Sequence, residues 1–156
     1  MTGVRSTSLY IKKEWLGVVF VIAALAGCGA DPSSQPDADD FALSNKVTGS
    51  VREWDVEVSA SRAKAGEVTF AIANFGSIQH EFLVTKTSFE PGKIPLGVNN
   101  RFDEELEGIE VVDEIPEWPV NEAKVLTLEL EAGTYELLCN IEGHYANGMH
   151  HMFVVE

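Results

Sequence analysis

Apolar and polar residues alternate along much of the chain after residue 46. Three stretches carry an apolar residue at every second position: Trp54, Val56, Val58; Val68, Phe70, Ile72; and Leu126, Leu128, Leu130. Because side chains of a strand point alternately to opposite faces, this period predicts strands that are buried on one face. Residues 80–86, 134–140 and 151–156 predict three further strands. Short strands joined by glycine-containing turns predict an all-β fold, an antiparallel Greek-key β-sandwich.

One long segment, residues 87–121, has no sustained period. It contains Pro91, Pro95, Pro116 and Pro119, and proline cannot donate a hydrogen bond to a sheet. We therefore expect an irregular insertion that lies over the sandwich, with a short helix near residues 103–108.

The N-terminus has the pattern of an export signal. Three basic residues, Arg5, Lys12 and Lys13, precede an uncharged and mostly apolar run at residues 15–30. A membrane-spanning helix needs about 20 such residues, so this run is more typical of a secretory signal peptide. The four residues that end at Cys28, LAGC, resemble the lipobox of bacterial lipoproteins, which implies cleavage before Cys28 and its acylation. A slightly short transmembrane helix is the alternative, and either interpretation exports the rest of the chain.

These features predict three parts. Residues 1–27 form the lipoprotein signal peptide, and residues 28–45, rich in Pro, Ser and Asp, form a disordered acidic tether because they bury too little apolar surface to fold alone. Residues 46–156 are about the size of one domain and form the sandwich. We expect a monomer that a lipid anchors to the extracytoplasmic face of the cell membrane, in a periplasm or at the cell surface.

The chain is strongly acidic, with a formal net charge of −14. Removal of residues 1–27 takes away three basic residues and one acidic residue, which leaves a formal charge of about −16. Such a surface repels nucleic acid phosphates and favours basic partners. Within the insertion the acidic residues gather in one cluster: Asp103, Glu104, Glu105, Glu107, Glu110, Asp113 and Glu114. This charge predicts a basic redox partner such as a cytochrome. The alternative is a solvated acidic insertion that only keeps the protein soluble.

Few residues in the chain can bind a soft metal, and they gather in two places. Cys139, His144 and Met149 follow one another at intervals of five residues, and His80 begins a predicted strand. Cys139 shares the parity of the inward-facing Leu137, and His80 shares that of Phe82, so two strand ends deliver these side chains to one end of the sandwich. One thiolate, two imidazoles and one thioether form the ligand set of a blue-copper centre.

The stretches NFGSIQHEF and CNIEGHYANGM resemble those of small blue-copper proteins, the cupredoxins of the plastocyanin and azurin family, with an auracyanin-like ligand loop. The resemblance implies one type 1 copper ion, with His80, Cys139 and His144 as strong ligands and Met149 as the axial ligand. It also implies single-electron transport through His144, within an apolar patch that Ile141, Tyr145 and Ala146 would form here. One departure is Glu81, which stands where the family often has Asn.

Several alternatives stay open. A copper-binding protein for copper resistance or delivery would carry similar motifs, as would a structural domain with a vestigial site. Zinc accepts Cys and His but would recruit Glu142 or His150 in place of a thioether. We do not expect an enzyme, because the four histidines of the chain provide no ligands for a second, catalytic copper. His150 and His151 point to opposite faces of a strand, so they are not expected to share an ion.

Overall fold

The computed structural model describes residues 43–156. The predicted signal peptide, the predicted lipidation site Cys28 and the predicted tether up to residue 42 lie outside the described residues. Leu43 forms a bridge with Arg62, and the predicted domain start at residue 46 coincides with the first strand. Within residues 43–156 no helix has the length and hydropathy that crossing a membrane requires.

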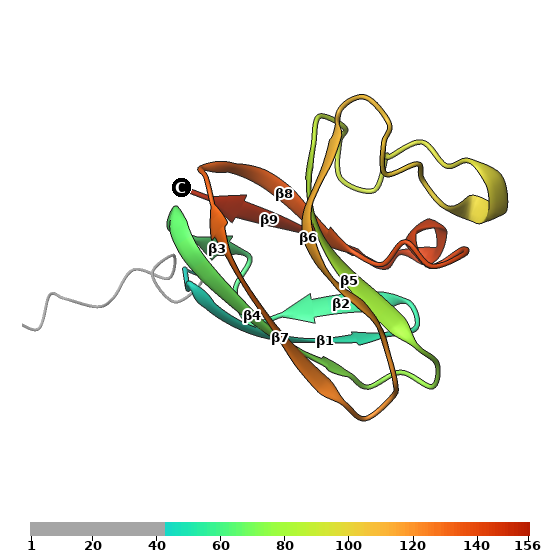
Figure 1. Cartoon of the computed structure of the whole chain (residues 1–156), viewed down its shortest axis with the longest axis horizontal. Helices are drawn as coiled ribbons and strands as arrows, with labels where there is room; N and C mark the ends of the chain where they lie inside the picture. The colour runs from blue at the N-terminus through green and yellow to red at the C-terminus, as the bar shows by residue number, and fades with distance from the viewer. Residues whose placement is uncertain (1–42) are drawn as a thin grey trace, which may run out of the picture. The chain divides into compact units, whose positions relative to one another are not determined.

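Two sheets pack face to face (Figure 1). The first has the strand order β2-β1-β4-β7, with bounds Asp55–Val58, Lys46–Arg52, Gly66–Asn74 and Ala123–Leu130. The second has the order β3-β9-β8-β5-β6, with bounds Arg62–Ala63, His150–Val155, Gly133–Leu138, His80–Thr87 and Ile109–Trp118. The prediction of an all-β Greek-key sandwich is confirmed.

The strand directions differ from the prediction in one respect, because both sheets are mixed. β1 pairs with β4 in parallel, and β3 pairs with β9 in parallel, whereas the other pairs are antiparallel. Between β1 and β4 the chain runs back along β2 and crosses to the other sheet at β3, and β4 then runs in the same direction as β1. Periodicity shows which face of a strand is buried but carries no information on its direction.

The main core fills the space between the sheets. Val68, Phe70 and Ile72 of β4 are fully buried, as their alternation predicts. The Phe70 ring packs against Phe82 of β5 and Phe153 of β9, with ring centroids 5.6 Å and 5.3 Å apart. Burial of each such side chain stabilises the fold by about 1.5–3 kcal/mol. The packed core therefore fixes the two sheets against each other, and with them the positions of the residues at the strand ends.

The insertion is irregular over residues 88–108 and covers the outer face of β5 and β8. There Leu83 and Leu138, which point away from the main core, form a second apolar cluster with Ile94, Phe102 and Tyr145. This confirms an insertion that lies over the sandwich. The helix expected near residues 103–108 is absent from the described structure, which has turns there and a single 3-10 turn at Val98–Asn100.

The predicted insertion was too long at its C-terminal end, because residues Ile109–Trp118 form the regular edge strand β6. The β5–β6 pairing shifts register twice, between His80 and Phe82 and between Val84 and Thr85. Each shift breaks the period of two, which explains why the sequence pattern missed the strand. Pro116 is tolerated because β6 is an edge strand.

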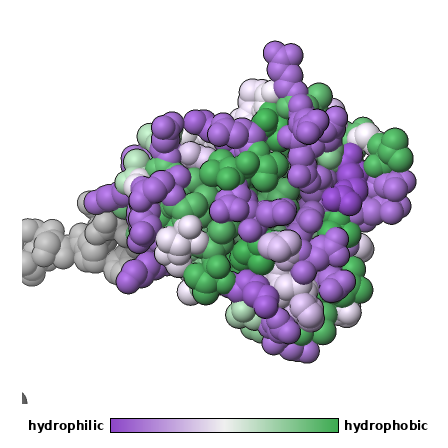
Figure 2. All heavy atoms as spheres, in the orientation of Figure 1, coloured by the Kyte–Doolittle hydropathy of each residue, from purple (hydrophilic) through white to green (hydrophobic). Residues whose placement is uncertain are grey.

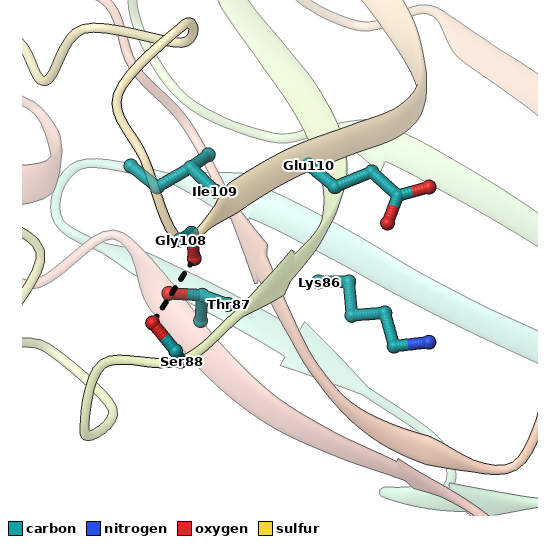
Figure 3. Close-up of a pocket in the computed structure, with 6 residues that line it drawn as sticks. All are labelled: Lys86, Thr87, Ser88, Gly108, Ile109 and Glu110. Carbon is teal, nitrogen blue, oxygen red and sulfur yellow. Dashed lines mark hydrogen bonds between the residues drawn. The ribbon is translucent and has the colours of Figure 1, made fainter.

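The insertion leaves and rejoins the sheet at a narrow neck (Figure 3). The backbone N–H of Ser88 donates to the carbonyl of Gly108 at 3.0 Å. A shallow hollow at this neck is lined by Lys86, Thr87, Ser88, Gly108, Ile109 and Glu110. It lies at the end of β5 opposite to His80, roughly 20 Å away for a strand of this length. The hollow is therefore separate from the cysteine and histidine residues.

The surface is largely acidic on the insertion and β6. All seven residues of the predicted acidic cluster, 103–105, 107, 110, 113 and 114, are exposed. On the face shown in Figure 2, hydrophilic and hydrophobic residues are interspersed.

Candidate metal centre

Adjacent strand ends bring the predicted metal-binding residues together. His80 is the first residue of β5, and Cys139 directly follows the last residue of β8. β5 and β8 pair in opposite directions, so the start of one strand meets the end of the other. His144 and Met149 lie in the segment that connects β8 to β9.

Three donor atoms converge in a buried cluster. His80 Nδ1 lies 3.2 Å from His144 Nδ1, and Cys139 Sγ lies 3.2 Å from the same His144 nitrogen. One ligand atom of each of these residues lies within 4.8 Å of the others. His80 and Cys139 are fully buried, and His144 is only 4% exposed. The cluster is thus compact and closed to bulk water.

Met149 belongs to the same end of the sandwich. Its side chain is fully buried in the apolar cluster that also contains Cys139. Its carbonyl accepts a hydrogen bond from the Cys139 N–H at 3.1 Å, and its own N–H donates to the carbonyl of His144 at 3.2 Å. The backbone therefore fixes Met149 against two of the three clustered residues.

The protonation states suit metal binding. Burial lowers the pKa of His80 and of His144, so both imidazoles are neutral and offer a lone pair. Burial also raises the pKa of the Cys139 thiol to about 12, against the opposite effect of the backbone N–H groups of Glu81 and Ile141. A cation must therefore displace the thiol proton, because only a nearby positive charge makes the buried thiolate favourable.

The donor set fits copper better than zinc. Two imidazoles, one thiol and a nearby thioether are the donors of blue-copper sites. The two residues that zinc would recruit lie elsewhere: Glu142 is exposed, and His150 Nδ1 faces Glu136 Oε1 at 3.2 Å. Among the described residues, the only group of three or more Cys, His, Asp or Glu side chains in metal-binding range is that of His80, Cys139 and His144.

The ligand segment is a tight turn with many internal hydrogen bonds. His144 N–H donates to Ile141 O at 2.8 Å, and a single 3-10 turn follows at Tyr145–Asn147. Gly143 and Gly148 have φ angles of 77° and 112°, which side chains rarely adopt. Glycine at both positions therefore allows this segment to turn tightly.

The prediction of an apolar surface patch around His144 is wrong for one of its three residues, Tyr145. Tyr145 is buried, and its hydroxyl donates to Glu136 Oε1 at 3.2 Å and accepts from Ile94 N–H at 3.3 Å. Ile141 is half-buried and Ala146 is exposed. Trp54, predicted as an inward-facing strand residue, instead lies in the β1–β2 turn, 46% exposed. Its ring meets the His144 ring edge-on, with centroids 5.3 Å apart.

Glu81 links the strands that carry the first two predicted ligands. One of its carboxylate oxygens accepts a hydrogen bond from the N–H of Asn140 at 2.7 Å. Burial raises the pKa of Glu81 to about 7, against the lowering effect of that hydrogen bond. The residue that departs from the family pattern therefore still bridges β5 to the segment after β8.

Glu53 was missed by the sequence pattern. Its carboxylate accepts hydrogen bonds from the backbone N–H groups of Ser77 and Ile78, and Oε1 lies 3.6 Å from His80 Nε2. Backbone hydrogen bonding lowers the pKa of Glu53, so this carboxylate is ionised. Glu53 lies 27 positions before His80 in the chain. No motif at that separation signals such a contact.

His150 and His151 face opposite sides of β9, as predicted. His150 approaches the buried Glu136, whereas His151 Nε2 lies 2.9 Å from the hydroxyl of Ser61.

The fold is that of auracyanin and rusticyanin. Reduced auracyanin from the photosynthetic bacterium Roseiflexus castenholzii aligns with a TM-score of 0.55 and 16% identity, over 73% of this chain and 98% of that chain. Rusticyanin from Thiobacillus ferrooxidans aligns with a TM-score of 0.53 and 23% identity, over 74% and 78% of the two chains. Another rusticyanin structure is described as that of a copper protein. No protein-family model and no curated protein sequence matches this chain. The predicted resemblance to the cupredoxin fold is confirmed.

Proposed function

We propose that this protein is a type 1 copper protein that carries single electrons between redox partners. The observation that carries the proposal is the convergence of His80, Cys139 and His144 in one buried cluster at the end of a cupredoxin-like sandwich. We assign these three residues as strong ligands and Met149 as the weak axial ligand. A bound copper ion would supply a one-electron couple between Cu(II) and Cu(I).

The protein's own residues contribute constraint. His80 is held by a strand, and Cys139 and His144 are held by the backbone hydrogen bonds of the ligand segment. A donor set that barely moves suits both oxidation states, so little rearrangement accompanies electron transfer. The burial of all three donors leaves no open position for a substrate, which favours a carrier over an enzyme.

The surface charge and the N-terminus suggest where the protein works and with what. The exposed acidic cluster suits a basic redox partner such as a cytochrome. If the acidic surface steers the partner, the rate of electron transfer falls as ionic strength rises. A rate that does not depend on salt would contradict this part of the proposal.

The lipobox-like residues suggest that a lipid at Cys28 holds the protein to the membrane on its extracytoplasmic side.

One experiment separates a carrier from a copper-delivery protein. The purified copper protein is reduced, challenged with a Cu(I) chelator of moderate affinity and then reoxidised. A carrier must keep its copper in both states, so we expect the visible absorption to return in full. Prompt transfer of Cu(I) to the chelator would show delivery instead.

A further inference from the structure

The outer nitrogen of His80 is buried without a hydrogen-bond partner. His80 Nδ1 faces the cluster, so Nε2 is the nitrogen on the far side of the ring. Nε2 is one of few buried side-chain nitrogen or oxygen atoms in the described residues that make no hydrogen bond. Its nearest charged neighbour is the carboxylate of Glu53, whose Oε1 lies 3.6 Å away. A buried polar atom of this kind is rare and calls for an explanation.

The carboxylate of Glu53 is fixed in place by its own contacts. Oε1 accepts from Ser77 N–H at 2.9 Å and from Ile78 N–H at 3.1 Å, and Oε2 is 3.2 Å from the same Ser77 nitrogen. The turn that provides these donors is itself anchored, because Asn74 bonds to Gly76 N–H and to the carbonyl of Ile78. The charge beside His80 is therefore held by backbone and does not swing freely.

Gly76 provides the space that the approach requires. A Cβ atom at this position would lie 2.5 Å from His80 Nε2 and 3.0 Å from Glu53 Oε2. Any other residue would thus push between the ring and the carboxylate. The φ of Gly76 lies outside the left-handed range, so the need for glycine here is steric.

We propose that Glu53 is a positioning residue for His80. Its negative charge attracts the Nε2 hydrogen, which fixes the ring orientation and the tautomer and leaves the Nδ1 lone pair directed at the cluster. The separation of 3.6 Å exceeds an ordinary hydrogen bond, so the attraction is mainly electrostatic. Carboxylate partners of this kind orient ligand histidines and increase their basicity. This last step rests on the proposed function: the same negative charge stabilises Cu(II) relative to Cu(I).

The competing explanation is that Glu53 only braces the turn at residues 76–78. The test uses Glu53→Gln, which keeps the shape and removes the charge, and Glu53→Ala, which removes both. The matched control is Glu57→Gln on the same β1–β2 hairpin, because it removes an equal charge from an exposed residue that pairs with Arg52.

The first measurement is made on the protein without metal. Nitrogen-15 NMR of the imidazole shows which nitrogen of His80 carries the hydrogen. We expect the Nε2–H form in the wild type and in Glu57→Gln, and a mixture of tautomers in Glu53→Ala. An unchanged Nε2–H form in Glu53→Ala would overturn the positioning role.

The second measurement is the reduction potential of the copper protein. We expect Glu53→Gln to shift the equilibrium about tenfold toward the reduced form relative to Glu57→Gln, which is about 59 mV for one electron. Equal potentials in the two variants would contradict an effect of the Glu53 charge on the metal. Failure of the wild type to take up copper would overturn the proposed function, whereas the tautomer measurement would still decide the role of Glu53.

Discussion

The two histidines of the cluster are held in different ways. His80 stands at a strand end, is fully buried, and has the fixed carboxylate of Glu53 behind its ring. His144 lies in a turn between strands and packs in a T-shaped arrangement against Trp54, an aromatic residue that is itself half exposed. We call the surroundings of His80 the strand side and those of His144 the loop side. The strand side is thus constrained by charge and backbone, and the loop side by packing and a tight turn.

This difference separates two requirements of an electron carrier. A ligand that must not move is best held by rigid structure, whereas the ligand that passes electrons must lie near the surface. In the proposed function His144 remains the expected electron port, and Trp54 is the exposed ring in contact with it. The following predictions test the two sides separately.

The largest effect on copper affinity is expected from Gly76→Ala on the strand side. The new Cβ would overlap His80 Nε2, so the ring or the Glu53 carboxylate must move. We expect a loss of about 1–3 kcal/mol in the free energy of unfolding and a fall in copper affinity of up to about 100-fold, measured by denaturation and metal titration.

The control for Gly76→Ala is Gly143→Ala on the loop side. There a Cβ meets nothing closer than Asn147 Nδ2 at 3.7 Å, but the φ of 77° is strained for alanine. We expect about 1–2 kcal/mol of destabilisation and a smaller loss of affinity. Equal losses of affinity in the two variants would remove the distinction between the sides.

A pH effect of about 3 kcal/mol is expected from Glu81, also on the strand side. Its pKa is raised from 4.5 to about 7 in the folded protein, so its protonated form stabilises the fold. That contribution is complete below about pH 4.5 and is lost as the pH rises through 7. The Glu81→Gln variant keeps a hydrogen-bond acceptor but does not titrate. In the metal-free proteins, its free energy of unfolding relative to wild type should therefore rise by about 3 kcal/mol as the pH is raised from 4 to 8. Parallel stability curves for the two proteins would contradict this.

A loss of about 1–3 kcal/mol is expected from Tyr145→Phe on the loop side. The change leaves Ile94 N–H without its partner and removes a donor from the buried Glu136. Hydrogen exchange should increase at residues 144–149. Tyr135→Phe serves as the control, since it removes a hydrogen bond to Glu131 and should leave exchange in that segment unchanged.

The smallest effect on stability, within about 1 kcal/mol, is expected from Trp54→Ala. Removal of the half-exposed ring uncovers His144 but not His80, so chemical modification of His144 in the metal-free protein should become several-fold faster. Phe75→Ala, an exposed aromatic residue on another turn, is the control. An equal increase at both histidines would show that the site as a whole has loosened.

The sequence predicted what depends on local periodicity. The alternation in β4 and β7 identified their buried faces, and the parity of Cys139 and His80 placed both at one end of the sandwich. β6 was missed because two bulges interrupt its alternation. Tyr145 was misplaced because its hydroxyl is satisfied by the buried Glu136, a contact between the turn after His144 and strand β8.

The contacts around the cluster depend on long-range packing and were not predictable from the pattern. Glu53 reaches His80 because the β1–β2 turn lies beside the turn at residues 76–78. Trp54 continues the alternation of β2 but lies beyond the strand end, where parity no longer determines direction. The sequence alone thus predicted the candidate donors, whereas the contacts that support them became visible only in the structure.

The most direct test of the ligand set is the visible spectrum of the copper-loaded protein and two variants. If Cys139 binds copper in a type 1 site, the oxidised wild type is intensely coloured through charge transfer from thiolate to copper. Cys139→Ser should lose the colour, and Met149→Leu should keep much of it because the axial bond is weak, while its reduction potential rises. A colourless copper-loaded wild type, or equal colour in Cys139→Ser, would contradict the assignment of these residues to a blue-copper centre.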